Sequence, residues 1–536
     1  METALIPPIA PHAVDEENDL AEAVAFRIGR PVDAWAVVAA LESEGWRDVD
    51  AKERFGREDL FGLADALYPD CVEESRRLGT TADAGPEAET LGALVRRFSA
   101  SYGRGLFYAL PVTGQVVALV ALGYSLWASI RLTEGGATMI ALGTLASFVT
   151  TAGFVQALAH ETSRLLGHRL GGQARRVAFR IARLGAWTVL GTGLLAFGVN
   201  VVVPFYPVLL MGIGTVYYVL LGWLWLALAL LYVEERLVAV AAATTLGILP
   251  VWGAVAGLGW NIHVAHALGL SVAIGLALAM ASRTLGAGAT ADRGDGPQPP
   301  LPRDSTIVHT TLPYVAYGVL YFAVLFVDRV VAWSASGDDP LAYPIWFRTD
   351  YELGMDWALV VLFAVLAAIP FPVRRMVGQI HELGRVKEPA TASAMMRRQY
   401  LRHLVVVMGI GVAAVAVAWA GGLWMYAHGP ELLTPIFEPG VTRFVFAIAA
   451  VGYFFLGLGL MNGLIFLAQG QTGRVLQPLA WALVLDVSVG FVMTRVLGYE
   501  HAGWGLLVAS VWFAGRTTAS ALRMLRRADF FSYVAY

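Results

Sequence analysis

A single carboxyl group, that of Asp486, lies near the middle of a long apolar stretch at about residues 475–496. A charge at the centre of a lipid bilayer costs ~2.5–3.5 kcal/mol on insertion scales, so an ionisable residue there is a functional candidate. Helical spacing places Ala482, Gly490 and Met493 on the same face, which is small enough to line a cavity. We interpret Asp486 as a coupling or gating residue. The alternative is a hydrogen-bonded carboxyl group that only ties two helices together.

A second pattern places aromatic rings and a carboxylate along one face of a helix at about residues 309–332. Its members recur at spacings of three and four and are Tyr314, Tyr317, Tyr321, Val324 and Asp328, with Arg329 next in sequence. Aromatic faces suit sugar rings, which present C–H groups and hydroxyls. We interpret this face, with Asp328 and Arg329, as a wall of a substrate path. The alternative is helix packing plus a charge pair whose Arg329 side chain snorkels to the membrane surface.

Other chemistry-bearing residues are few. Asn200 and Asn462 lie in apolar stretches and are predicted to form hydrogen bonds between helices. The sequence has no phosphate-binding loop, no dinucleotide fingerprint and no His/Glu metal spacing. Cys71 is the only cysteine, which excludes an intramolecular disulfide. We therefore expect no metal, no cofactor, no nucleic-acid partner and no enzymatic activity.

The elements that position these side chains are apolar stretches, each about the ~20 residues that a membrane-spanning helix needs. Hydrophobic residues make up 57% of the chain and charged residues only 15%. The sequence therefore predicts an all-α polytopic membrane protein with about twelve transmembrane helices. They are expected at about residues 107–128, 137–158, 184–204, 208–231, 237–258, 262–281, 309–332, 355–373, 404–426, 443–468, 475–496 and 502–522.

A Gly-, Ala- and Pro-rich segment from Gly286 to Pro302 divides the predicted helices into two equal groups. Such a division is typical of two lobes related by an axis along the membrane normal. The predicted parts are a cytoplasmic N-terminal region at 1–90, a first six-helix lobe at 91–283, a cytoplasmic linker at 284–307, and a second six-helix lobe with a cytoplasmic tail at 308–536.

The distribution of basic residues predicts the orientation. Arginine-rich stretches at 164–183 and 374–402 follow the second and eighth predicted helices, whereas connections after odd-numbered helices are poor in Lys and Arg. The connection after the seventh is acidic, with Asp350 and Glu352 among its residues. Because basic connections stay on the cytoplasmic side, we expect both termini in the cytoplasm.

The N-terminal region has its own pattern. Residues 1–20 are predicted to be disordered, and a helical module is expected at about 28–68, with Pro31 at the first position of its first helix. Residues 78–90 have the composition of a linker. Trp35 and Trp46 are large for so small a module, and we expect one of them to remain exposed for a partner.

Several short runs of the membrane part resemble one known family. They are Tyr317-Gly318-Val319-Leu320-Tyr321-Phe322, Val327-Asp328-Arg329-Val330-Val331-Ala332-Trp333, Tyr217-Tyr218, Trp223-Leu224-Trp225, Gly503-Trp504-Gly505 and Asp529-Phe530-Phe531-Ser532-Tyr533. In the same order over about 104–536, they resemble the exopolysaccharide Pel transporter (PelG-like) family of the multidrug/oligosaccharidyl-lipid/polysaccharide exporter superfamily. Residues 1–90 have no counterpart in that family.

The resemblance implies a flippase-like transporter of the bacterial cytoplasmic (inner) membrane that exports a biofilm polysaccharide or its lipid-linked precursor. It implies a cytoplasmic glycosyltransferase and other membrane subunits as partners, beside membrane lipid and the saccharide itself. Two alternatives stay open: a cation-coupled small-molecule exporter of the same superfamily, and a non-transporting membrane scaffold for a polysaccharide synthase.

Overall fold

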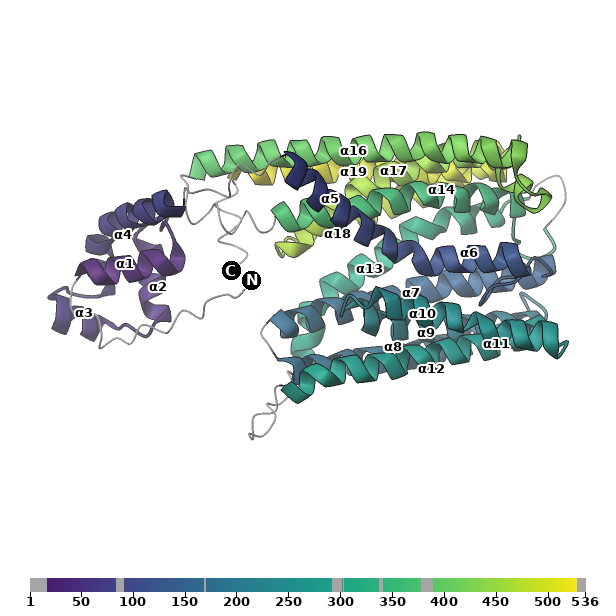
Figure 1. Cartoon of the computed structure of the whole chain (residues 1–536), viewed down its shortest axis with the longest axis horizontal. Helices are drawn as coiled ribbons and strands as arrows, with labels where there is room; N and C mark the ends of the chain where they lie inside the picture. The colour runs from purple at the N-terminus through teal and green to yellow at the C-terminus, as the bar shows by residue number, and fades with distance from the viewer. Residues whose placement is uncertain are drawn as a thin grey trace.

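The computed structural model describes residues 17–82, 91–167, 170–291, 301, 303–336, 341–376 and 389–527. Within these residues the chain is helical, and the only strand-type pairing is one bridge between Tyr124 and Ser129. The prediction of an all-α polytopic fold is confirmed. A bundle of long helices fills most of the molecule, and a group of short helices lies beyond one end of it (Figure 1).

The short helices form the N-terminal module. They are α1 (Glu17–Ile28), α2 (Ala34–Ser43), α3 (Asp48–Phe55) and α4 (Leu60–Ala82). The module has its own hydrophobic core, which includes the fully buried Leu20, Leu41 and Leu63. Cys71 lies in this core, where burial raises the pKa of its thiol to about 12. The folded module therefore protects the one cysteine of the chain from thiol reagents.

Three predicted boundaries of the module are corrected. Helix α1 begins at Glu17, inside the stretch predicted to be disordered, because its apolar face packs into the module's core. Helix α2 begins at Ala34 and not at Pro31, and Asp33 is its N-cap, since the Asp33 carboxylate accepts a hydrogen bond of 3.0 Å from Ala36 N. Helix α4 continues to Ala82, into the predicted linker. Residues 1–16 and 83–90 lie outside the described residues.

The bundle is built from two successive sets of helices. The first set is α5 (Leu91–Leu106), α6 (Leu110–Leu122), α7 (Glu134–Gly167), α8 (Gly171–Val202), α9 (Val208–Tyr232), α10 (Leu237–Leu246), α11 (Ile248–Trp252) and α12 (Ile262–Ala291). The second set is α13 (Asp304–Trp333), α14 (Thr349–Ala368), α16 (Pro389–His428), α17 (Val441–Ala468), α18 (Gly473–Val496) and α19 (Gly503–Met524).

Among the described residues, eleven helical segments are long and apolar enough to cross a membrane. The twelfth predicted span corresponds to α19, which packs against α17 and α18 but carries Arg516 and falls outside that set. Two predicted limits also move. The first span runs from Gly92 to Leu122, because α5 leads directly into α6, and the eighth begins at Thr349 and not at 355.

Each set of helices has a separate hydrophobic core, so the bundle consists of two lobes. Helix α13 joins them, because it packs against α7 of the first lobe and α18 of the second. The α7–α13 crossing is close: a Cβ at Gly318 would lie 2.6 Å from the carbonyl oxygen of Ala152. Helix α5 crosses to the second lobe and packs against α14 (Figure 1).

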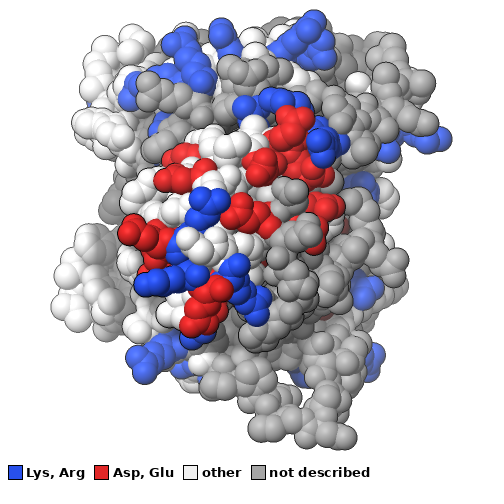
Figure 2. Space-filling view, turned by 90° about the vertical axis from the view of Figure 1, so that its left-hand side faces the viewer, with Lys and Arg blue, Asp and Glu red and all other residues white. Residues whose placement is uncertain are grey.

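We name the two ends of the bundle by their connections. The 341–348 end carries the connection between α13 and α14, and the 468–473 end carries the connection between α17 and α18. Viewed from the side on which the module lies, Lys and Arg side chains surround the module, whose own surface carries many Asp and Glu (Figure 2). Over residues 17–82 the module has fifteen acidic and eight basic residues. The cytoplasmic position of both termini stays a prediction.

Candidate functional site

The second lobe encloses a group of ionisable side chains that we call the lobe-two charge cluster. It comprises Asp328, Arg329, Glu352, Asp356 and Asp486. Asp328 and Arg329 lie in the last two turns of α13. Glu352 and Asp356 lie in the first two turns of α14, and Asp486 lies in the middle of α18. All but Asp356 are buried. Three carboxyl groups and one arginine are therefore buried in the lobe, and the exposed Asp356 lies beside the arginine.

Arg329 is held by carboxylates of the neighbouring helix. Its Nη1 donates to Glu352 and, at 2.9 Å, to Asp356 Oδ1. Trp333 Nε1 donates to the other oxygen of Glu352 at 2.9 Å. The interpretation that Arg329 snorkels to the membrane surface is wrong, because its side chain is 5% exposed. Removing one partner of a buried ion pair costs about 3–5 kcal/mol, so these bonds lock α13 to α14.

Asp328 and Asp486 are less well satisfied. Asp328 Oδ2 accepts a hydrogen bond of 2.8 Å from the Tyr351 hydroxyl, but its Oδ1 has no partner among the described residues. Neither carboxylate oxygen of Asp486 has one. Three of the four oxygens of these two buried carboxyl groups therefore have no hydrogen-bond partner among the described residues. The two carboxyl groups lie on α13 and α18, which pack against each other.

Asp486 faces a close helix contact and not an open cavity. A Cβ at Gly505 of α19 would lie 2.7 Å from Asp486 Oδ1 and 2.9 Å from the backbone nitrogen of Gly490. Gly490 and Ala482, predicted to share the face of Asp486, are buried. The small residues thus let α19 approach Asp486.

The predicted tyrosine face points partly into the second lobe. Tyr317 is 4% exposed and belongs to the lobe-two core, whereas Tyr314 and Tyr321 are half-buried at its margin. The Tyr314 ring stacks on the ring of His160 of α7, with 3.7 Å between centroids. Tyr317 and Tyr321 stack on each other at 6.2 Å. In this conformation Tyr314 lies at the junction of the lobes, and a substrate wall formed by the whole face stays a prediction.

The two predicted asparagine bridges differ. Asn462 of α17 joins three helices, since Tyr400 of α16 donates to it at 2.8 Å and its own amide donates to Thr517 and Thr518 of α19. Asn200 of α8 instead binds the backbone N–H and C=O of Tyr206, in the connection that follows its own helix.

At the 341–348 end, hydrogen bonds tie the second lobe to the first. The Tyr206 hydroxyl donates to Ile345 O at 2.8 Å and accepts from Ile345 N at 3.2 Å. Phe347 N donates to Thr138 Oγ1 at 3.1 Å. These contacts close the lobes against each other at this end. They involve a connection and helix ends, which can separate without unfolding a lobe.

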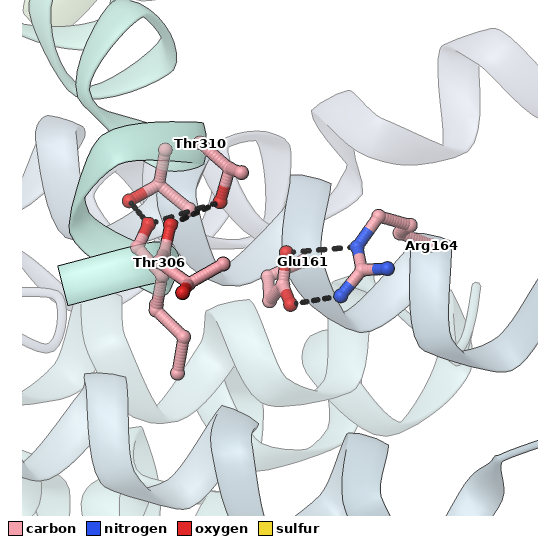
Figure 3. Close-up of polar contacts among 6 residues, drawn as sticks. Glu161, Arg164, Thr306 and Thr310 are labelled. Atoms are coloured by element: carbon pink, nitrogen blue, oxygen red, sulfur yellow. Dashed lines mark hydrogen bonds and ion pairs between the residues drawn. The ribbon is translucent and has the colours of Figure 1, made fainter. Parts of the chain in front are cut away.

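Towards the other end, the lobe junction contains a carboxylate that sequence analysis did not identify. Glu161 of α7 has a side chain that is 1% exposed, and it accepts two hydrogen bonds from Arg164, at 2.5 and 3.1 Å. Figure 3 shows this pair together with Thr306 and Thr310 on α13, the helix that packs on α7.

Sequence analysis also missed Glu352. It assigned this residue to an acidic connection, whereas α14 begins at Thr349 and buries Glu352 in its first turn. The available signal was Trp333 and Arg329 on the preceding helix, which need an acceptor when they are buried. Among the described residues, no three His, Cys, Asp or Glu side chains come close enough to hold a metal ion.

No family model and no curated protein sequence matches the chain. Solved structures do match, and they show that the chain has the fold of MOP superfamily transporters. A MOP superfamily transporter from Pyrococcus furiosus has a TM-score of 0.55 at 13% identity, over 79% of this chain and 96% of its own. An Asp-to-Asn variant of the Vibrio cholerae MATE transporter VcmN has a TM-score of 0.55 at 14% identity, over 81% of this chain and 99% of its own. A multidrug resistance MATE family transporter in its outward-facing conformation has a TM-score of 0.54 at 16% identity, over 79% of this chain and 96% of its own.

Proposed function

We propose that this chain is an alternating-access exporter that moves a saccharide polymer, or its lipid-linked precursor, across the cytoplasmic membrane of a bacterium. The observation that carries the proposal is the closure of the 341–348 end by hydrogen bonds between the two lobes. Breaking a few such bonds costs little for a conformational change, since each contributes only about 0.5–1.5 kcal/mol. An exporter must open at one end while the other stays closed.

The saccharide class rests on the residues of α13. Its Tyr-rich run resembles the Pel transporter family, and it lies where the two lobes meet. Phe148 of α7 stacks on Phe322 of α13 at 5.3 Å and on Trp225 of α9 at 4.4 Å, so aromatic rings continue from Tyr314 along this junction. When the lobes separate, these rings become a surface that suits the C–H faces of sugars.

The lobe-two charge cluster supplies a coupling device for this exporter. Asp328 and Asp486 lie on α13 and α18, which pack together, and α13 also packs on the first lobe. Adding or removing a proton at this pair changes the repulsion between α13 and α18, and so favours one arrangement of α13 over the other. In this proposal Asp486 is the coupling residue and Asp328 its partner.

A second candidate is a cation-coupled exporter of small molecules. The observation that favours it is the fold match to a multidrug resistance MATE family transporter, together with the same buried carboxyl pair. Both candidates share the mechanism and differ only in cargo.

Deletion of the gene separates the candidates. Secreted carbohydrate and sensitivity to a panel of cationic drugs are measured in the deletion strain and in a strain that carries the gene on a plasmid. Loss of one secreted polymer, restored by the plasmid, supports saccharide export. Unchanged carbohydrate with increased drug sensitivity supports the second candidate and contradicts the first.

A further inference from the structure

The second lobe contains a cavity of about 750 Å³ at its 468–473 end. It lies between the connection from α17 to α18, the first turns of α18 and the second half of α19. Among the described residues its lining includes three arginines and no Asp or Glu. The polar residues are Gln471, Thr472, Arg474, Gln477, Arg516, Ser520 and Arg523.

Helix α19 presents one polar face to this cavity. Arg516, Ser520 and Arg523 are separated by four and three residues, which places them on the same side of a helix. Arg523 Nη2 donates to Ser520 Oγ at 3.3 Å, and the Arg516 guanidinium lies 5.7 Å from the ring centroid of Trp512. Neither arginine forms an ion pair with a described residue. The guanidinium groups of Arg516 and Arg523 therefore face the cavity without a counter-charge from the part of the chain that the structure describes.

Arg516 is an exposed arginine on a largely apolar helix. It lies past the middle of α19, thirteen residues from Gly503 and eight from Met524. An arginine at the centre of a spanning helix is costly, and such residues face a water-filled cavity or pair with an opposite charge. Here the cavity is present, and the described residues that line it include no opposite charge. An anionic ligand would supply it.

The other wall of the cavity also favours an anion. Helix α18 begins at Gly473, so its first backbone N–H groups and the positive end of its dipole lie beside Arg474. Thr472, before the helix, makes no side-chain capping hydrogen bond. Arginine on one wall and a helix N-terminus on the other are the groups that proteins use to bind phosphate oxygens, because guanidinium donates two parallel hydrogen bonds to them.

We propose that this cavity is a binding site for a phosphate-bearing anion, either the headgroup of an acidic lipid or a free phosphate compound. Basic pockets between transmembrane helices at the membrane surface have the chemistry for such headgroups. The site lies within the second lobe, apart from the lobe-two charge cluster, and it does not depend on the proposed export function.

The test uses the full-length protein purified in a neutral detergent. Binding of dioleoyl phosphatidic acid is measured by native mass spectrometry, with dioleoyl phosphatidylcholine as the zwitterionic control lipid and inorganic pyrophosphate as a water-soluble competitor. The variants are Arg516→Gln, Arg516→Lys and Arg523→Gln. Arg236→Gln is the matched control, because Arg236 is an exposed arginine outside the cavity.

We expect the wild type and Arg236→Gln to bind phosphatidic acid equally and to prefer it over phosphatidylcholine. Arg516→Gln and Arg523→Gln should each bind it about tenfold more weakly, as expected for the loss of a charge-assisted hydrogen bond, and Arg516→Lys should retain most of the binding. Should Arg516→Gln fail to fold, Arg523→Gln decides, since Arg523 is exposed near the helix end.

The competitor distinguishes the two sources. Displacement by pyrophosphate supports a free phosphate compound, and lipid that stays bound supports a headgroup. The proposal is overturned if the wild type binds neither ligand, if it binds the two lipids equally, or if both glutamine variants bind phosphatidic acid as tightly as the wild type.

Discussion

Replacing Gly505 by alanine should disturb the contact that brings α19 against Asp486. The added methyl group would lie 2.7 Å from Asp486 Oδ1 and 2.9 Å from Gly490 N, and closer still to the carbonyl oxygen of Asp486. Ordinary contacts between such atoms are about 3.5 Å. Helix α19 must therefore move away from α18 by about 1 Å, or Asp486 must shift.

Gly515 on the same helix is the matched control, because a Cβ at this position meets nothing within 4 Å. Both substitutions gain about 0.5–1 kcal/mol from the lower backbone freedom of alanine. Only Gly505→Ala incurs the cost of overpacking, about 1–3 kcal/mol, and the backbone atoms involved cannot simply rotate away. We therefore expect Gly505→Ala to be less stable than Gly515→Ala by about 1–3 kcal/mol.

The assay is thermal unfolding of both variants in the same detergent, followed by size-exclusion chromatography. A lobe of this size should lose about 2–4 °C in Tm for each kcal/mol. Export is measured at a temperature where both variants remain folded, and Gly505→Ala should export less because its Asp486 is displaced. If Gly505→Ala is as stable as Gly515→Ala and exports normally, the packing of α19 on Asp486 is not as described.

Three further outcomes are expected. Asp486→Asn keeps the size of the side chain and removes its charge, so membrane abundance should be normal and export strongly reduced. Full export would assign Asp486 to helix packing, whereas reduced export with normal assembly would argue against the scaffold alternative. Because Trp35 is 67% exposed, Trp35→Ala should leave the module folded and abolish its binding to a cytoplasmic glycosyltransferase in co-purification. Trp46 is 2% exposed, so Trp46→Ala should unfold the module at a cost of about 3–5 kcal/mol. A Trp35→Ala chain that retains every partner argues against docking. In intact cells an impermeant maleimide should label a cysteine placed at Trp260 and not one placed at Arg236, since the positive-inside rule puts the first outside and the second in the cytoplasm; the reverse pattern contradicts the orientation.

The sequence predicted the class of fold because long apolar helices are its strongest local signal. Asp486 and its small neighbours were recognised for the same reason: a charge within an apolar helix stands out against its surroundings. Helix limits were less well predicted. The first turn of α14 contains Asp350 and Glu352, and hydropathy alone assigns such residues to a connection.

The partners of the site residues could not be predicted, because they come from helices far apart in the chain. Arg329 is bound by Glu352 and Asp356, and Asp486 meets Gly505, through packing that no local pattern specifies. Arg516 was missed for a different reason. A single arginine within a largely apolar helix is not conspicuous in the sequence, and its importance depends on the cavity beside it.

The most direct test of the exporter is to lock the two lobes together at the 341–348 end. Thr138 Oγ1 and Phe347 N are 3.1 Å apart across the lobes, so cysteines at positions 138 and 347 can be joined by oxidation or a short bis-maleimide. Secretion of the carbohydrate that the deletion strain lacks is then measured. We predict that the disulfide-locked protein stops secretion and that a reductant restores it, while each single-cysteine variant secretes normally. Full secretion by cells whose protein is completely crosslinked would contradict alternating access.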